Sequence, residues 1–280
     1  MTCVVPCIFL KEPAILDLTM ITSSQNSKIK HIRALLTNRQ DRQQEKVFVI
    51  EGVRLVEEAA RSGVKPELAL FSSELSPRGR ELVENFASTG CHVEEVDVRI
   101  LHGLSDTETP QGILAVVPQL EGQLPKDWDL LVVLDQIRDP GNLGTILRSA
   151  VAAGAQGLVL TPGSVDVYSP KVVRAGMGAH FRLPLLTLDW PEISAACKQN
   201  RPAPAALLIA DSDRGSPCWQ TDLRQPVALV IGSEADGPQP AAFAAADGLL
   251  HIPMPGKAES LNAAVAASIL LYEVVRQRNS

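Results

Sequence analysis

A strong positive charge is missing from this sequence. Its 280 residues include 26 Lys and Arg against 32 Asp and Glu, which gives a formal net charge of -6. The chain as a whole therefore lacks the strongly basic character of many nucleic-acid-binding proteins, although a local basic patch is enough to bind phosphates. Aromatic residues make up only 4% of the chain, so base stacking on aromatic platforms is not its obvious strategy.

Cysteine and histidine patterns that bind metals are also missing. The five cysteines are scattered, odd in number and without a Cys-x-x-Cys pair, which argues against a zinc ribbon. We interpret them as reduced thiols of a cytoplasmic protein. The five histidines have no metal-binding spacing either, so we expect structural or surface roles for them and no metal cofactor.

Long hydrophobic runs are absent as well. No apolar run approaches the ~20 residues that a membrane span requires, so we predict no contact with a membrane. Residues 1–19 have no basic start and make a poor signal peptide. We predict that they form a disordered tail or an over-extended start, and that the first ordered segment begins at Met20.

Several familiar catalytic motifs do not occur. The GxxxxGK[ST] phosphate loop is absent, and the segment AGMGAH has Phe181 where a dinucleotide-binding fingerprint needs its third glycine. No GxSxG nucleophile elbow is present. These absences argue against a P-loop NTPase, a Rossmann dehydrogenase and an α/β-hydrolase.

What the sequence does contain is an alternation of helix and strand patterns, which indicates two α/β domains. We place the first domain at residues 20–118, a polar linker with Gly and Pro at 119–128, and the second domain at 129–280. In the first domain we predict helices at 28–37, 53–62, 78–89 and 98–104, and strands at 47–50, 68–71, 92–96 and 113–117. Candidate N-caps of the first helix are Ser23, Ser24, Asn26 and Ser27, and the helix at 53–62 should bury Val53, Val56 and Ala60.

The second domain shows the same alternation without a sequence repeat. We predict strands at 130–134, 158–160, 185–188, 206–210, 228–231 and 249–252, and helices at 143–153, 171–178, 192–199 and 261–278. The last helix carries a face of small residues that could pack closely against another surface: Ala263, Ala264, Ala266 and Ala267.

The first helix and the segment after it are locally basic. The positive or titratable residues are Lys28, Lys30, His31, Arg33, Arg39, Arg42 and Lys46. Such a run is either a solvated helix face or a patch that contacts phosphates, and the sequence pattern alone leaves both interpretations open.

Three loops of the second domain each follow a predicted strand, where open α/β sheets bind ligands. The first contains Asn142 and leads to Arg148, the second contains Gly232-Ser233-Glu234 with Gly237, and the third contains Pro253, Gly256, Ser260 and Asn262. Each loop has a plain structural interpretation. Asn142 could cap a helix with Arg148 at the surface of its second turn, the glycines could form a turn, and Ser260 or Asn262 could cap the last helix.

Taken together, these loops resemble the SpoU (TrmH-like) family of RNA ribose methyltransferases, within the knotted SPOUT class. The resemblance rests on DPGNLGTILRSAVAAGA, IGSEADGP and IPMPGKAESLNAAVAASILLYE, which follow one another in the family's order, and on PKVVRAGMGAHFRLP. In the first domain, NSKIKHIRALL and FVIEGVRLVEEA are typical of the small ribosomal-protein-like RNA-binding domain that many members carry.

This resemblance implies a fold, an activity and a set of site residues. The fold would be α/β, a parallel sheet with helices on both faces and a deep trefoil knot formed by the last segment. The activity would be transfer of a methyl group from S-adenosylmethionine to a ribose 2′-hydroxyl of RNA. The residues that match the family's donor-binding and neighbouring positions are Gly232, Ile252, Leu261, Met254 and Ser260, and those that match its active-site positions are Asn142, Arg148, Glu234 and Asn262.

Arg148 is the residue that the resemblance places at the reacting hydroxyl. A guanidinium remains protonated in proteins, with a pKa above ~12, so it would be a very poor base. We expect it to orient the ribose and its phosphate and to stabilise the developing alkoxide charge. We expect Glu234 to orient Arg148 or Asn262, or to hold its loop.

The resemblance also implies partners. We expect a homodimer, because the alanine-rich last helix suits a close helix interface between two chains. We expect RNA contacts by Lys28, Lys30, Arg33, Arg39 and Arg42 in the first domain and by Lys171 and Arg174 in the second. Ribosomal RNA is the preferred substrate, with transfer RNA as the alternative. A protein that keeps the fold and binds RNA without methylating it is the competing hypothesis.

Overall fold

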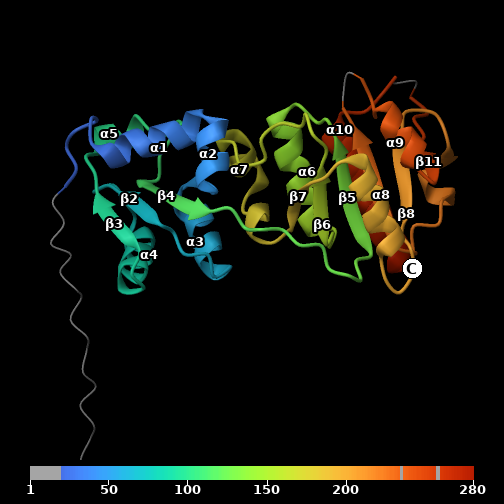
Figure 1. Cartoon of the computed structure of the whole chain (residues 1–280). Coiled ribbons are helices and arrows are strands. Elements are labelled where there is room, and N and C mark those ends of the chain that lie inside the picture. Colours follow the sequence, from blue (N-terminus) through green and yellow to red (C-terminus); the bar gives the residue numbers. More distant parts are fainter. Residues whose placement is uncertain (1–19, 234–235, 257–258) are drawn as a thin grey trace, which may run out of the picture.

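The computed structural model describes residues 20–233, 236–256 and 259–280, and the tail predicted at 1–19 lies outside these described residues. Two β-sheets lie side by side, each with its own helices (Figure 1). The first is four-stranded and the second is seven-stranded. Among the described residues, no helix has the length and apolar character needed to cross a membrane.

The first sheet is mixed and has the strand order β1-β4-β2-β3. Strand β4 runs antiparallel to β1 and β2, whereas β2 and β3 are parallel. Every residue of β2 is buried, because helices cover both faces of this sheet. The elements are α1 (Ser27–Thr37), α2 (Arg39–Glu45), β1 (Val47–Glu51), α3 (Val53–Arg61), β2 (Leu68–Phe71), α4 (Pro77–Ser88), β3 (His92–Glu95), α5 (Val98–His102) and β4 (Ile113–Pro118).

Two details of this domain differ from the sequence predictions. Helix α2 was not predicted, because RQDRQQE has no apolar periodicity; it begins at the N-cap Asn38, whose side chain accepts a hydrogen bond from the Gln40 N–H. Helix α3 buries Val53, Val56 and Ala59, whereas Ala60, which we predicted to be inward, is only half-buried. Of the candidate caps of α1, Asn26 is the one that accepts from the Lys28 N–H.

The second sheet is parallel and has the order β7-β6-β5-β10-β8-β11-β9. Strand β9 and helix α9 were not predicted from the sequence. The elements are β5 (Leu130–Asp135), α6 (Pro140–Ala152), β6 (Gly157–Leu160), α7 (Pro170–Gly176), η1 (Ala179–Phe181), β7 (Leu185–Thr187), α8 (Trp190–Gln199), β8 (Ala206–Asp211), β9 (Ser216–Pro217), η2 (Cys218–Gln220), β10 (Val227–Gly232), α9 (Pro240–Ala245), β11 (Gly248–His251) and α10 (Ala263–Arg278).

Helices cover both faces of the second sheet, as the resemblance implied. Along β5, Leu130, Val132 and Leu134 pack in the core under α6 and α10. The alternate residues Leu131 and Val133 pack in the core under α8 and α9. Side chains of a strand alternate between the two faces, so an uninterrupted apolar run is what a doubly covered strand requires.

The alanine face of α10 packs inside its own chain. Ala263, Ala264 and Ala267 are buried in the core shared with the sheet and α6, and Ser268 exchanges a hydrogen bond with Ser149 of α6 at 2.8 Å. We had related these alanines to an interface with a second chain. Their small side chains instead bring α10 close to its own domain.

The two ends of residues 119–128, predicted as a linker, contact the two domains, and most residues between these ends are exposed. Trp128 is buried in the core under α8 and α9. At the other end, the Gln119 N–H donates to the Lys46 carbonyl at 2.7 Å, and the Gln119 side chain donates to the Arg42 carbonyl at 2.8 Å. The polar composition suggested a spacer, but the buried Trp128 and the hydrogen bonds of Gln119 fix the two ends of the segment.

The two domains meet at a contact that we call the domain seam, where α7 and the segment before it face β1 and α2 (Figure 1). Arg42 of α2 binds Asp166 through Nε at 2.8 Å and Nη2 at 2.7 Å. Phe48 lies against the rings of Tyr168, His180 and Phe181, with centroids 4.9 to 6.0 Å apart. The predicted knot stays a prediction.

Candidate functional site

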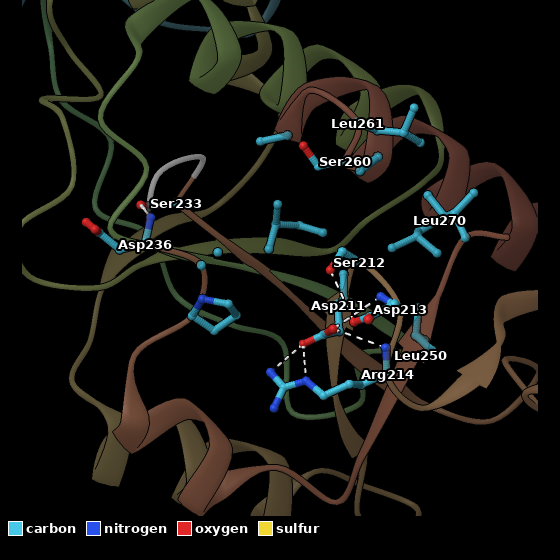
Figure 2. A pocket seen from close by; sticks show the side chains of 18 of the residues that line it. Asp211, Ser212, Asp213, Arg214, Ser233, Asp236, Leu250, Ser260, Leu261 and Leu270 are labelled. Carbon is cyan, nitrogen blue, oxygen red and sulfur yellow. Dashed lines mark hydrogen bonds and ion pairs between the residues drawn. The ribbon is translucent and has the colours of Figure 1, made fainter. Parts of the chain in front are cut away.

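A cavity of about 480 Å³, the main cavity, opens at the carboxyl ends of three neighbouring strands, β10, β8 and β11. Figure 2 shows that its walls come from the loops after these strands and from the first half of α10. Parallel strands place their carboxyl ends at one edge of the sheet, which is where such folds bind ligands. The residues that line it include Asp211, Arg214, Gly232, Pro238, Phe243, Ile252, Met254, Ser260, Leu261 and Leu270.

The five residues predicted for donor binding all line this one cavity. They come from three separate segments: Gly232 ends β10, Ile252 and Met254 follow β11, and Ser260 and Leu261 precede α10. Gly232 is at a close approach of two backbone segments, because a Cβ there would lie 2.4 Å from the Pro238 nitrogen. Only glycine leaves this wall as it is.

A fourth loop, after β8, also lines the main cavity, and the sequence reading missed it. Asp211 accepts hydrogen bonds from the Arg214 guanidinium at 2.6 and 3.0 Å, and that guanidinium lies 4.8 Å from the centroid of the Phe243 ring. The available signal was the polar run DSDRG directly after the strand predicted at 206–210. The rule that found the other three loops applies to this one equally.

The charge on Asp211 is stabilised by its neighbours. Burial alone would raise the pKa of its carboxyl group, but hydrogen bonds from the Arg214 side chain and from the Arg214 and Asp213 backbone outweigh it and lower the pKa to about 2. Asp211 is therefore a carboxylate at neutral pH, already bound to a cation at the rim of the main cavity.

Asp135, at the end of β5, holds the neighbouring loops in place. It is fully buried, and its carboxylate accepts from the Thr161 hydroxyl at 2.8 Å, from the Gln239 N–H at 2.7 Å and from the Gln239 side chain at 2.9 Å. Thr161 follows β6, and Gln239 follows the Gly237-Pro238 wall of the main cavity. A buried carboxylate bonded in this way fixes three strand ends relative to one another.

The structure brings two of the four predicted active-site residues together. The Asn262 side chain donates to the Asn142 side-chain oxygen at 3.0 Å, although the two residues are 120 positions apart. Asn262 also caps α10, accepting from the Ala264 and Val265 N–H groups. The cap of α6 is Asp139 and not Asn142, because the helix begins at Pro140 and the Asn142 N–H is itself a donor to Asp139.

Arg148 lies on the third turn of α6, one turn later than predicted, because the helix begins at Pro140 and not at Leu143. Its side chain is exposed, does not line the main cavity, and has no hydrogen-bond or ion-pair partner among the described residues. Glu234, the fourth predicted active-site residue, lies outside the described residues. An unbound arginine one to two turns from Asn142 is available to a further ligand.

The predicted RNA-contacting residues differ in how they are bound. Lys30 and Arg33 of α1 and Lys171 of α7 are exposed without an ion-pair partner in the described part of the chain. Lys28 pairs with Glu94, Arg174 pairs with Asp106 at 3.2 Å, and Arg39 donates to the Ser164 carbonyl at 3.5 Å. Arg42 is a correction: it is 4% exposed and held by Asp166, so it connects the domains and is not at the surface.

No group of three or more His, Cys, Asp or Glu side chains in the described ranges is arranged to hold a metal ion.

Comparison with known proteins agrees with this geometry. Residues 129–272 match the model of the SpoU rRNA Methylase family, and residues 26–115 match an MRM3-like substrate binding domain. The chain is 33% identical to the 23S rRNA (guanosine(2553)-2'-O)-methyltransferase RlmP of Bacillus subtilis, over 91% of this chain and 98% of that protein. It is 36% identical to the 23S rRNA (uridine(2479)-2'-O)-methyltransferase of Streptomyces viridochromogenes, over 92% of each.

A solved structure has the same fold. The SpoU methyltransferase AviRb from Streptomyces viridochromogenes, in complex with AdoMet, superposes with a TM-score of 0.82 at 34% identity, over 91% of this chain and 99% of that chain. Similarity over nearly the whole length, in both domains, exceeds what a shared fold alone would give. The chain belongs to the SpoU rRNA methylase family.

Proposed function

We propose that this protein transfers a methyl group from S-adenosylmethionine to a ribose 2′-hydroxyl of ribosomal RNA. The observation that carries the proposal is the convergence of Gly232, Ile252, Met254, Ser260 and Leu261 on one cavity. Asn262, which bonds Asn142, lies between the lining residues Leu261 and Ala263. The relatives at 33% and 36% identity are named as 23S rRNA 2'-O-methyltransferases.

The main cavity suits S-adenosylmethionine in size and character. Its volume of about 480 Å³ lies in the range of small-molecule sites, and its walls combine apolar side chains with exposed backbone. Ile252, Leu261 and Leu270 can cover a flat adenine ring, and the backbone at Gly232 can approach it closely. When bound, the donor supplies a methyl group on a sulfonium sulfur, which is a good leaving group. The chain therefore has to position the ribose and stabilise the negative charge that develops on its 2′-oxygen.

We assign the ribose side to Arg148 and the Asn142–Asn262 pair. The guanidinium of Arg148 is exposed, so it can bind an RNA phosphate and stabilise the negative charge that develops on the ribose oxygen as the hydroxyl passes its proton to a phosphate oxygen or to solvent. The hydrogen bond from Asn262 orients the Asn142 amide. For Glu234 we propose that it orients Arg148 or Asn262, or holds its loop.

We further propose that residues 20–118 form the RNA-binding domain and residues 129–280 the catalytic domain. The match of residues 26–115 to a substrate binding domain supports this division. Lys30 and Arg33 present two exposed charges one helical turn apart on α1, and Lys171 and Arg174 do the same on α7. Arg42 is left out of this surface because it is buried.

We propose a homodimer in the cytoplasm. Val265, Ile269 and Tyr272 of α10 are 48%, 40% and 54% exposed, and their spacing places them in one stripe along the helix. Such an exposed apolar stripe suits a second copy of the chain. Light scattering should give twice the chain mass of 30.1 kDa, and a monomer at micromolar concentration would refute the dimer.

The test of function is incubation with labelled S-adenosylmethionine and RNA from cells that lack the gene. Label in a large ribosomal RNA, in an alkali-resistant dinucleotide, is the expected result. Label in the small RNA fraction would assign transfer RNA instead, and no label with intact donor binding would favour a non-catalytic RNA-binding protein. Arg148→Ala should reduce transfer ~100-fold or more while donor affinity stays unchanged. Near-normal turnover would refute its role.

A further inference from the structure

A second, smaller cavity lies at the domain seam. This seam cavity has a volume of about 190 Å³ and is formed by α2 on one side and the loop after β6 on the other. Helix α2 and its end contribute Arg39, Gln43 and Lys46, which the spacing of four and three residues places on one face. The loop contributes residues 160–168.

The seam cavity carries positive charge that the protein does not neutralise. Arg39 and Lys46 are exposed, and neither forms an ion pair with any residue that the structure describes. Arg39 makes only one long hydrogen bond, 3.5 Å to the Ser164 carbonyl. The one carboxylate in the wall, Asp166, is already bound by Arg42. Two free cations in a chain of net charge -6 indicate a site for an anion.

Lys46 is held in a conformation that disfavours lysine. Its backbone is left-handed, with φ 58° and ψ 33°, where glycine or asparagine is common. The Gln119 N–H bond to the Lys46 carbonyl fixes this turn. Strained non-glycine residues are concentrated at functional sites, and this one places a cation at the seam cavity.

The wall also contains a hydroxyl group with no bonding partner. Ser164 is 6% exposed, and its Oγ has no hydrogen-bond partner among the described residues. Buried hydroxyls are normally bonded, so this hydroxyl, in a residue that lines the seam cavity with Arg39 and Lys46, can bond a ligand there once its side chain rotates toward the cavity.

The seam cavity lies on the same edge of the sheet as the main cavity. Thr161, in its wall, donates to Asp135, and Asp135 accepts from Gln239, which follows the wall of the main cavity. Strand β6 is two strands from β10, which corresponds to roughly 10 Å at the usual strand spacing. A strand of RNA that reaches the main cavity can pass over the seam cavity a short distance away.

We propose that the seam cavity binds a backbone phosphate of the substrate RNA, through Arg39, Lys46 and the Ser164 hydroxyl. This inference rests on the proposed function and adds to it a defined anchor between the two domains. The phosphate would set the distance between the RNA bound by the first domain and the ribose presented to the second. Phosphate contacts fix register and orientation without reading the base.

The first test is the double variant Arg39→Gln/Lys46→Gln. Its matched control is Lys126→Gln/Lys198→Gln, which removes two exposed charges that lie before β5 and β8, at the opposite edge of the sheet. With an unmodified 23S ribosomal RNA transcript, the first variant should raise KM about tenfold and leave kcat and the Kd for S-adenosylmethionine unchanged. The slope of log affinity against log salt should fall by ~0.7, as for one lost phosphate contact to a single strand.

The second test is Ser164→Ala. Because this hydroxyl has no hydrogen-bond partner among the described residues, its removal should leave the unfolding midpoint unchanged or higher and weaken RNA binding a few-fold. Lower stability with unchanged RNA affinity would overturn its role.

The outcomes separate this site from the proposed function. If the wild-type protein methylates RNA and Arg39→Gln/Lys46→Gln matches its KM and salt slope, the phosphate site is refuted and the function stands. An equal effect in the control pair would also refute it, because the loss would then reflect overall charge. If the wild type methylates no RNA, the function fails, and the direct RNA-binding comparison still decides the site.

Discussion

The main cavity and the domain seam are built in opposite ways. The main cavity is open, belongs to one domain and is lined by glycine, apolar and polar side chains from three strand ends and α10. The domain seam is packed, joins two domains and is made of a buried ion pair and four rings. The comparison teaches that donor binding and domain cohesion are separable in this protein. Changes to the packed side chains of the domain seam should alter stability and leave donor affinity intact, and changes to the glycine wall of the main cavity should mainly alter donor affinity.

The largest expected effect is at the Arg42–Asp166 pair. Arg42→Met leaves the Asp166 carboxylate buried without its cation, which should lower the free energy of unfolding by about 3–5 kcal/mol in urea titrations. The double variant Arg42→Met/Asp166→Asn should recover most of that loss. Arg224→Met, which breaks the exposed pair with Asp222, is the matched control and should cost under ~1 kcal/mol. Equal losses in Arg42→Met and Arg224→Met would contradict the distinction between the pair at the domain seam and the exposed pair.

The next effect is the pH dependence contributed by His180. Burial lowers its pKa to about 4, although its hydrogen bond to the Val167 carbonyl and the nearby Asp166 act in the other direction. The unfolded chain takes up this proton near pH 6.5 and the folded chain only near 4, so the stabilisation present above 6.5 is lost as the pH falls between these values.

The loss should reach roughly 3 kcal/mol at most, by 1.36 kcal/mol per pKa unit. Urea titrations at neutral pH and near pH 4.5 measure it, and His180→Phe should reduce the difference. His31→Asn is the control, because His31 is at the surface beside Glu45. An unchanged pH dependence in His180→Phe would show that other groups cause it.

The third effect concerns donor affinity at the main cavity and not the stability of the domain seam. Gly232→Ala introduces a Cβ that would lie 2.4 Å from the Pro238 nitrogen and 2.6 Å from the Gly237 carbonyl carbon, so the wall of the main cavity must shift. We expect the Kd for S-adenosylmethionine to rise on the order of 100-fold by calorimetry, about 2.7 kcal/mol. Gly256→Ala, where a Cβ meets no atom within 4 Å, should bind normally. Tight binding by Gly232→Ala would mean that the donor does not approach this backbone.

The smallest effect is at Asp211. Its pKa of about 2 lies below the ordinary value of 3.8, so its stabilisation is present above pH 3.8 and is lost as the pH falls toward 2. Asp211→Asn should therefore shift the acid-unfolding midpoint slightly upward in pH. Asp213→Asn, at an exposed neighbouring carboxylate, is the control and should not. The exposure of Arg214 keeps the expected shift small.

The same contrast explains what the sequence could predict. Strands β5 and β10 and most helices were predicted from apolar periodicity, and the residues predicted for donor binding came from the motifs that resemble the SpoU family. Helix α2 and the Arg42–Asp166 pair could not be found in this way, because α2 is polar on every face and its partner is 124 residues away. Arg42 is indistinguishable from Arg39 in a list of basic residues, and only the fold buries one of them.

Helix α10 shows a second limit of pattern reading. Its alanines suggested a surface for a partner chain, but in the structure they face the sheet, and Val265, Ile269 and Tyr272 are outside. Small residues indicate close approach without indicating to what. The rule that loops after parallel strands bind ligands also applied to Asp211 and Arg214, but these two residues lie outside the family motifs.

At position 46, thermal stability and RNA methylation favour different residues. A left-handed lysine costs on the order of 1 kcal/mol relative to glycine, so Lys46→Gly relieves the backbone and removes a charge from the seam cavity in one step. Selection of a random library for heat resistance alone should enrich glycine or asparagine at this position. Selection for methylated ribosomes should keep the lysine, and a lineage under both pressures would have to seek its thermal tolerance elsewhere in the chain.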